Sequence, residues 1–324
     1  MILLLVACSS EEQKDSAVFQ QDLEVELQCL EGEGSGLPIA PSRYNFTRAD
    51  NNDRGAGGSE LLPHTAKVVK ELCIVYSTFT EAINHDPAAT MFQTGSVIAG
   101  RPSMGAWSHY GLGSDNRNLP GFVVLNHGVV PCGGLENYSN GFLPARHQAT
   151  MFAVDGPPVR NLLPADKNEQ VQLSKLALLK GRDRAFSQSL GGDDAIDSAI
   201  RNYELAFRMQ SMIPEILDLS EETRATQAAY AVDSKVKSQS LFGIQCLRAR
   251  RLVESGVRFV EITCAPGNAN GTWDQHSNLK KGHEKNSLDT DQSITALIKD
   301  LKARGMLDET PVSYTHLRAH EPLR

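Results

Sequence analysis

The sequence predicts an α/β fold in which helices pack on a mainly parallel sheet. Three short apolar segments are predicted to be buried strands, at residues 73–77, 122–125 and 257–263. Between them, apolar residues recur at three- and four-residue steps, which is the spacing of amphipathic helices. Alternation of these two patterns is typical of the α/β class.

The clearest unit comes near the end of the chain, where a helix at 241–254 is followed by the strand 257–263 and a helix at 287–304. Gly256 and Gly305 end the two helices. An arginine cluster at 248, 250 and 251 lies near the C-terminal end of the first helix, where cations favour the helix dipole. Helix, strand and helix in this order predict a parallel α/β unit.

Earlier elements are predicted from their caps. Ser59 precedes a helix with one apolar face, and this helix leads into the strand 73–77. Asp86 is predicted as the N-cap of a second helix that has Pro87 at its first position and Gly95 as its stop. A third helix opens at Pro102. Residues 168–240 are predicted to be a helical insertion within a domain that spans 59–312.

The N-terminal region, residues 1–58, allows two interpretations. The aliphatic run 2–7 suits a fully buried parallel strand. Alternatively, it is a shortened lipoprotein signal in which Cys8 carries a lipid anchor. Residues 31–58 are rich in turn formers and are predicted to form a long surface loop.

Composition excludes several classes of function. With 324 residues, the chain is one large domain or two ordinary ones. Its net charge of −7 gives no positive field for nucleic acid, and no apolar run is long enough for a membrane span. The cysteines have no spacing suited to a structural zinc site.

The strongest chemical motif is the segment 273–278, in the loop after the strand 257–263. Asp274 and His276 are two apart, so in an extended segment both point to the same side and can bind one metal ion. A carboxylate and an imidazole suit zinc or manganese. The loop leaves the carboxyl end of a parallel strand, which is where α/β sheets bind ligands. The alternative is a polar surface loop or cap.

A second motif is Asn84 and His85, next to the predicted helix start at Asp86. Backbone N–H groups at such a start favour an anion, and His85 can act as an acid, a base or a ligand. Arg101 precedes the next helix and could bind a phosphate or sulfate group. Structural capping is the alternative for both. Phosphate loops, dinucleotide motifs and serine triads are absent from the sequence.

Several ordered blocks together resemble the bacterial family called domain of unknown function 1501, from about Ser59 to Val312. These blocks are Asn84-His85-x-Pro87-Ala88, the segment 100–107, the segment 119–123, the segment 141–144, the segment 250–259 and Trp273-Asp274-x-His276-x-Asn278. The resemblance implies a three-layer α/β/α sandwich of the alkaline phosphatase and sulfatase type, exported to the periplasm or cell envelope. It also implies a divalent metal (zinc, manganese or calcium), with Asp274 and His276 among its ligands.

The chain departs from this family pattern at its C-terminal end. After Val312 the family has a Gly-Glu-Phe-Gly-Arg-Thr block and later an Asp-His pair. Here residues 313–324 resemble translated adapter sequence, for which no strand or packed helix is predicted. The resemblance therefore implies an incomplete site and an inactive fragment. The Cys-x-Pro-x-Arg motif of formylglycine sulfatases is also missing.

Two functions of different class follow. The first is a metal-dependent hydrolase that acts on small-molecule phosphate or sulfate esters. In it His85 is catalytic, and Asn84, Arg101 and Asn278 contact the substrate; Ser77, Thr78 and Thr80 are candidate nucleophiles. The second is an exported binding or assembly protein with a sulfatase-like fold and no turnover. For the first, we expect His85, Asp274 and His276 to line one pocket.

Overall fold

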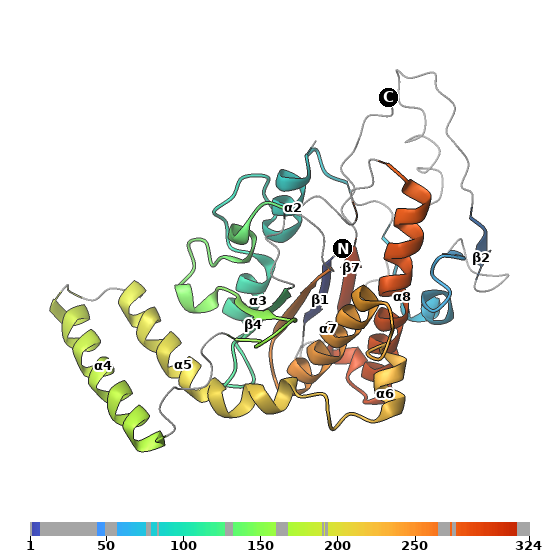
Figure 1. Ribbon diagram of the computed structural model, residues 1–324. Helices are drawn as coiled ribbons and strands as arrows, with labels where there is room; N and C mark the ends of the chain where they lie inside the picture. Colours follow the sequence, from blue (N-terminus) through green and yellow to red (C-terminus); the bar gives the residue numbers. More distant parts are fainter. Residues whose placement is uncertain are drawn as a thin grey trace.

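The computed structural model describes residues 2–6, 44–48, 57–75, 79–82, 84–126, 132–159, 168–189, 191, 194–264, 273 and 277–315 (Figure 1). Its strands are β1 (Ile2–Val6), β2 (Phe46–Arg48), β3 (Gly57–Ser59), β4 (Phe122–Asn126), β5 (Thr150–Ala153), β6 (Phe259–Thr263) and β7 (Val312–Thr315). Its α-helices are α2 (His85–Thr94), α3 (Met104–Leu112), α4 (Glu169–Ser189), α5 (Asp194–Leu217), α6 (Arg224–Ala229), α7 (Lys237–Glu254) and α8 (Leu279–Ala303). Short 3-10 helices are η1 (Thr65–Glu71), η2 (Leu135–Tyr138), η3 (Ala145–His147) and η4 (Leu307–Glu309).

The central sheet confirms the predicted α/β class. Its strand order is β5-β4-β6-β1-β7. β4 runs parallel to both β5 and β6, so the predicted strands 122–125 and 257–263 are neighbours. β1 runs antiparallel to β6 on one side and to β7 on the other. The short strands β2 and β3 form a separate antiparallel pair.

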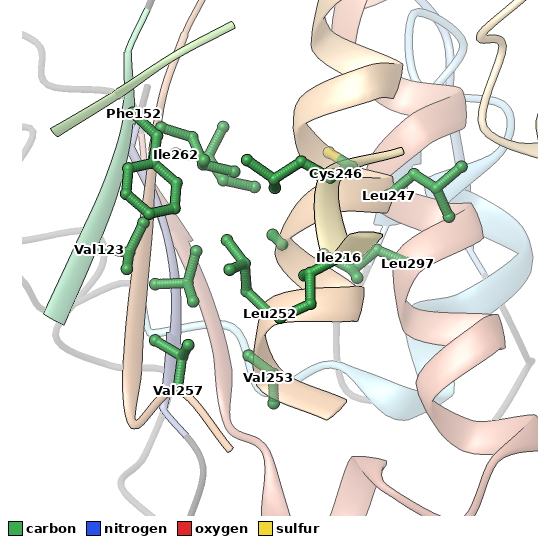
Figure 2. Close-up of a cluster of buried hydrophobic side chains, with 14 of the residues drawn as sticks. Val123, Phe152, Ile216, Cys246, Leu247, Leu252, Val253, Val257, Ile262 and Leu297 are labelled. Atoms are coloured by element: carbon green, nitrogen blue, oxygen red, sulfur yellow. The ribbon is translucent and has the colours of Figure 1, made fainter. Parts of the chain in front are cut away.

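The main hydrophobic core lies between one face of this sheet and the helices α5, α7 and α8. Because side chains alternate along a strand, every second residue of β4 and β6 faces this core. The sheet contributes Val123, Leu125, Val260 and Ile262, all fully buried or nearly so. Figure 2 shows these strands facing Cys246, Leu247 and Leu252 of α7 and Leu297 of α8.

A smaller core lies on the opposite face of the sheet. Phe122, Val124 and Phe259 are buried there, and the rings of Phe122 and Phe259 meet edge to face. Tyr138 of η2 and Phe92 of α2 pack against them, and α3 contacts both β4 and β6. Helices therefore lie against both faces of the sheet (Figure 1).

The predicted unit of helix, strand and helix is confirmed as α7, β6 and α8. The two helices run side by side in the same direction, because contacts join successive parts of both in the same order. At the start of α7, Ser238 Oγ donates to Asp289 Oδ1, near the middle of α8, at 2.9 Å. Near the ends, Arg250 lies against Asp300. α8 begins at Leu279, eight residues before the predicted start (287 − 279).

The helical pattern predicted for residues 168–240 is also confirmed, as α4, α5 and α6. It is not separate from the core, because Ile213, Ile216 and Leu217 of α5 are buried in it. α4 projects from the rest of the molecule (Figure 1), whereas α5 also contacts η3. α4 exposes Leu173, Leu178, Leu179 and Phe186.

The predicted strand 73–77 is wrong where the structure describes it. Residues 73–75 form no strand, and Ile74 and Val75 are 42% and 60% exposed; residues 76 and 77 lie outside the described residues. The helix before it begins at Thr65 rather than beside Ser59, and it is a 3-10 helix. The physical reason is that both sides of β6 are occupied, by β4 and by β1.

Both termini of the described chain also differ from prediction. The aliphatic run near the start does form a strand, β1, but it is antiparallel to its neighbours rather than parallel. Residues 313–315, for which no strand was expected, form β7 with Val312 and pair with β1. β2, β3 and β5 were not predicted, since each is only three or four residues long. No helix among the described residues is long and apolar enough to cross a membrane.

The contact between α7 and the segment after α6 depends on a glycine. A Cβ atom at Gly243 would lie 2.0 Å from the carbonyl oxygen of Tyr230. We expect Gly243→Ala to lower the free energy of unfolding by about 1–3 kcal/mol, because α7 and the backbone at Tyr230 must move apart to make room for the methyl group. Urea unfolding measures this. The matched control is Gly181→Ala on α4, where no heavy atom lies within 4 Å and alanine should stabilise by about 0.5–1 kcal/mol. Equal effects at the two positions contradict this account.

Candidate functional site

The carboxyl ends of β4 and β6 form the edge at which a site is expected. Because the two strands are parallel, both end on the same side of the sheet. β4 ends at Asn126, which is buried, and β6 ends at Thr263. Gln245 of α7 donates to the carbonyl oxygens of Leu125 at 3.0 Å and Thr263 at 3.2 Å. Polar groups therefore fix the two strand ends to each other and to α7.

The chain leaves this edge in opposite directions. The next described residues after β4, which begin at Cys132, pack on the face covered by α2, where Gly133 N–H donates to Asp86 Oδ1 at 3.0 Å. After β6 the chain returns as α8, which packs beside α7 on the other face. Such a reversal between neighbouring parallel strands is a topological switch point, which is the place where open α/β sheets bind ligands.

Asn84 and His85 lie on one side of this switch point, at the start of α2. His85 is the first helical residue and Asn84 the N-cap, without a side-chain capping bond. The prediction that Asp86 caps this helix is wrong: its carboxylate accepts from Gly133 instead. The predicted stop at Gly95 is confirmed, in the left-handed conformation. The Asp86 contact holds the start of α2 against the segment that follows β4.

The other predicted site residues are spread over different parts of the chain. Asn278 is the exposed N-cap of α8, with a left-handed backbone at φ 54°, so it lies on the helix of the opposite face from α2. Arg101 is exposed in the loop before α3; that loop is held to another segment, since Ser103 Oγ donates to the carbonyl oxygen of Ser139. Asp274 and His276 lie outside the described residues, so the shared pocket stays a prediction.

One buried acid was not among the predicted site residues. Glu261, in the middle of β6, is fully buried and accepts a hydrogen bond from Gln93 Nε2 of α2 at 2.6 Å. Burial raises the pKa of Glu261 to about 8, against the opposing effect of the nearby polar side chains of Gln93 and Tyr138. The signal was present in the sequence, because an acid in a strand buried on both faces needs a partner or a proton.

Two histidines form a second buried polar group, between α3 and η3. The rings of His109 and His147 meet edge to face with centroids 4.6 Å apart. Burial, followed by the positive charges of nearby arginines and the other ring, lowers the pKa of His109 to about 4. The pKa of His147 is lowered for similar reasons. His147 is buried, and its ring nitrogens have no hydrogen-bond partner among the described residues.

These observations define an α/β protein with a polar switch point between two central parallel strands. A family model described as a protein of unknown function (DUF1501) matches residues 9–315. The chain therefore belongs to the DUF1501 family. No curated protein and no solved structure matches the chain.

Proposed function

We propose that this protein is a metal-dependent hydrolase of phosphate or sulfate esters, with its site at the carboxyl edge of β4 and β6. The switch point between these strands carries the proposal. Asn84 and His85 are held on one side of it, and the chain that leaves β6 contains Asp274 and His276. Helices on both faces of the sheet support the finer proposal of a sandwich of the alkaline phosphatase and sulfatase type.

Asp274 and His276 would hold the divalent ion, for which their carboxylate and imidazole are suitable donors. Within the described residues, no group of three or more histidine, cysteine, aspartate or glutamate side chains could hold a metal ion. A bound zinc, manganese or calcium ion would polarise the ester oxygen.

The residues of α2 supply the second part of the proposed chemistry. The first N–H groups of a helix point outward and favour an anion such as phosphate or sulfate. His85, at this end of α2, would exchange a proton with the leaving or attacking oxygen. Asn84, Asn278 and Arg101 are proposed substrate contacts. The family resemblance also supports export to the periplasm or cell envelope.

Metal affinity is the first test. We expect purified protein to bind zinc or manganese in calorimetric titration, and Asp274→Ala or His276→Ala to weaken the affinity at least about tenfold, because each removes a ligand. The matched control is Asp308→Ala, an exposed acid of η4 beyond the other end of α8, which should bind as the wild type does. Equal metal affinity in the wild type and all three variants would contradict the assignment of Asp274 and His276 as metal ligands.

Turnover is the second test. Because the family resemblance implies an incomplete site in these 324 residues, the assay uses the product of the full-length parent gene, with a series of aryl phosphates and aryl sulfates and the metal that binds. We expect His85→Gln to keep its metal affinity and to lose turnover on the best ester, because the amide cannot exchange a proton at neutral pH. Metal binding without turnover on any ester contradicts the hydrolase proposal.

One observation favours the alternative function, an exported binding or assembly protein without turnover. α4 projects from the molecule (Figure 1) and exposes four large apolar side chains. Exposed apolar residues that gather on one element are typical of surfaces that contact other molecules. Bound metal without hydrolysis would favour this function over the first.

A further inference from the structure

Glu261 is a charged residue type in a place where a charge is costly. It lies between Val124 of β4 and Leu4 of β1 in the strand register, on the face that α2 covers. None of its surface reaches water. A carboxylate in such a position is stable only if it is paired or holds a proton.

The contacts of Glu261 leave two oxygens without a donor. Gln93 Nε2 donates to Glu261 Oε1 at 2.6 Å. Glu261 Oε2 and Gln93 Oε1 are both buried without a hydrogen-bond partner among the described residues. Both of these oxygens are acceptors when the carboxyl is ionised. One proton on Oε2 would change this, because it could be donated to the amide oxygen of Gln93 and would give the pair two hydrogen bonds.

The surroundings of Glu261 favour that proton. α2 brings the neutral Gln93, η2 brings the phenol of Tyr138, and the neighbouring strand β4 brings Val124. Among the described residues, no positively charged side chain contributes to the pKa of Glu261, which burial raises to about 8. Burial and the nearby carboxyl of Glu261 also raise the pKa of Tyr138. At neutral pH, Glu261 is therefore mainly uncharged.

We propose that Glu261 and Gln93 form a proton-dependent latch that holds α2 on the sheet. With the proton in place, the two side chains bind each other through two hydrogen bonds. Without it, a buried carboxylate faces an amide oxygen, and α2 must move to admit water. The start of α2 carries Asn84 and His85, so the latch also sets their position; only this last consequence rests on the proposed hydrolase function.

The latch is tested by amide hydrogen exchange of the full chain, read by mass spectrometry between about pH 7 and about pH 9.5, on either side of the Glu261 pKa. After correction for the intrinsic change in exchange rate, we expect protection of α2 to fall at least about tenfold while that of α7 is retained. In the Glu261→Gln variant, the protection of α2 should fall by less than about twofold over the same pH range, because a second amide can make both hydrogen bonds at any pH. The control Glu136→Gln, on the exposed surface of η2, should behave as the wild type does.

A second measurement covers the case in which Glu261→Gln does not fold. The infrared band of a protonated carboxyl should be present in the wild type at neutral pH and disappear as the pH passes about 8. Gln93→Met should reduce the protection of α2 already at neutral pH, because the partner amide is gone. Unchanged α2 protection in the wild type across the pH range, or absence of the protonated band at neutral pH, overturns the latch. Both readouts are independent of turnover, so they stand even if the hydrolase proposal fails.

Discussion

Replacement of Arg250 by methionine is expected to lower the free energy of unfolding by about 3–5 kcal/mol. The Arg250 side chain is only 2% exposed and lies 2.6 Å from Glu222, 2.6 Å from Glu254 and 3.1 Å from Asp300. It joins α7 to α8 and to the turn before α6. Methionine has a similar length but no charge, so Glu222 and Asp300 lose a partner inside the protein.

Urea unfolding of the two proteins measures this loss. The matched control is Arg304→Met, which removes an arginine paired with the same Glu254 and Asp300 but with a side chain 36% exposed. Water can replace a partner at that position, so we expect a loss below about 1 kcal/mol. Similar losses for both variants would contradict the view that burial, rather than ion pairing itself, makes Arg250 important.

Acidification from pH 7 to pH 4 is expected to lower the free energy of unfolding by about 2–3 kcal/mol through His109 alone. The pKa of His109 is about 4 in the folded protein and 6.5 in its ordinary state. Between these values the unfolded chain binds a proton that the folded protein does not, so stability rises with pH. The contribution of neutral His109 to the free energy of unfolding is complete above about pH 6.5 and falls as the pH is lowered towards 4. Below pH 4 this contribution does not change further. The full shift corresponds to about 3 kcal/mol, reduced because the ring keeps some contact with water.

The measurement compares wild type and His109→Phe by urea unfolding at several pH values. Phenylalanine keeps a ring beside His147 but does not titrate. Because the carboxylates titrate in both proteins, their effect cancels in the difference, and the difference should depend on pH only between about 4 and 6.5. A constant difference across this range would show that His109 is charged in the folded protein.

The parts of the fold that could be predicted are those set by local sequence. The unit α7, β6 and α8 has long apolar periodicity and glycine stops, so its type and order follow from the chain itself. The run 73–75 has the same apolar character as a strand but no partner in the sheet. Pairing is decided by the whole chain, and here Ile2–Val6 takes the place beside β6. A short apolar run cannot contain that information.

The same limit applies to the candidate site. The motif of Asn84 and His85 and its position at a helix start could be predicted, because a helix start has a local signature. The role of Arg250 could not: the arginine cluster suggested a helix-dipole effect, whereas the structure pairs Arg250 with Glu222 on another segment. Glu261 was visible as an acid in an apolar strand, but its partner Gln93 lies 168 positions away.

The position of β1 has a consequence for the order in which the molecule can be made. β1 is synthesised before the other described strands, yet both of its neighbours, β6 and β7, are synthesised after residue 258. At about 5–20 residues per second, Leu3, Leu4 and Leu5 wait about 13–50 s for the first partner. During this interval an apolar segment has no neighbouring strand and is open to aggregation. Assembly of the central sheet is therefore slow, because β1 and its partner strands are far apart in the sequence. Nascent chains of this protein are expected to need protection from aggregation until β6 has been synthesised.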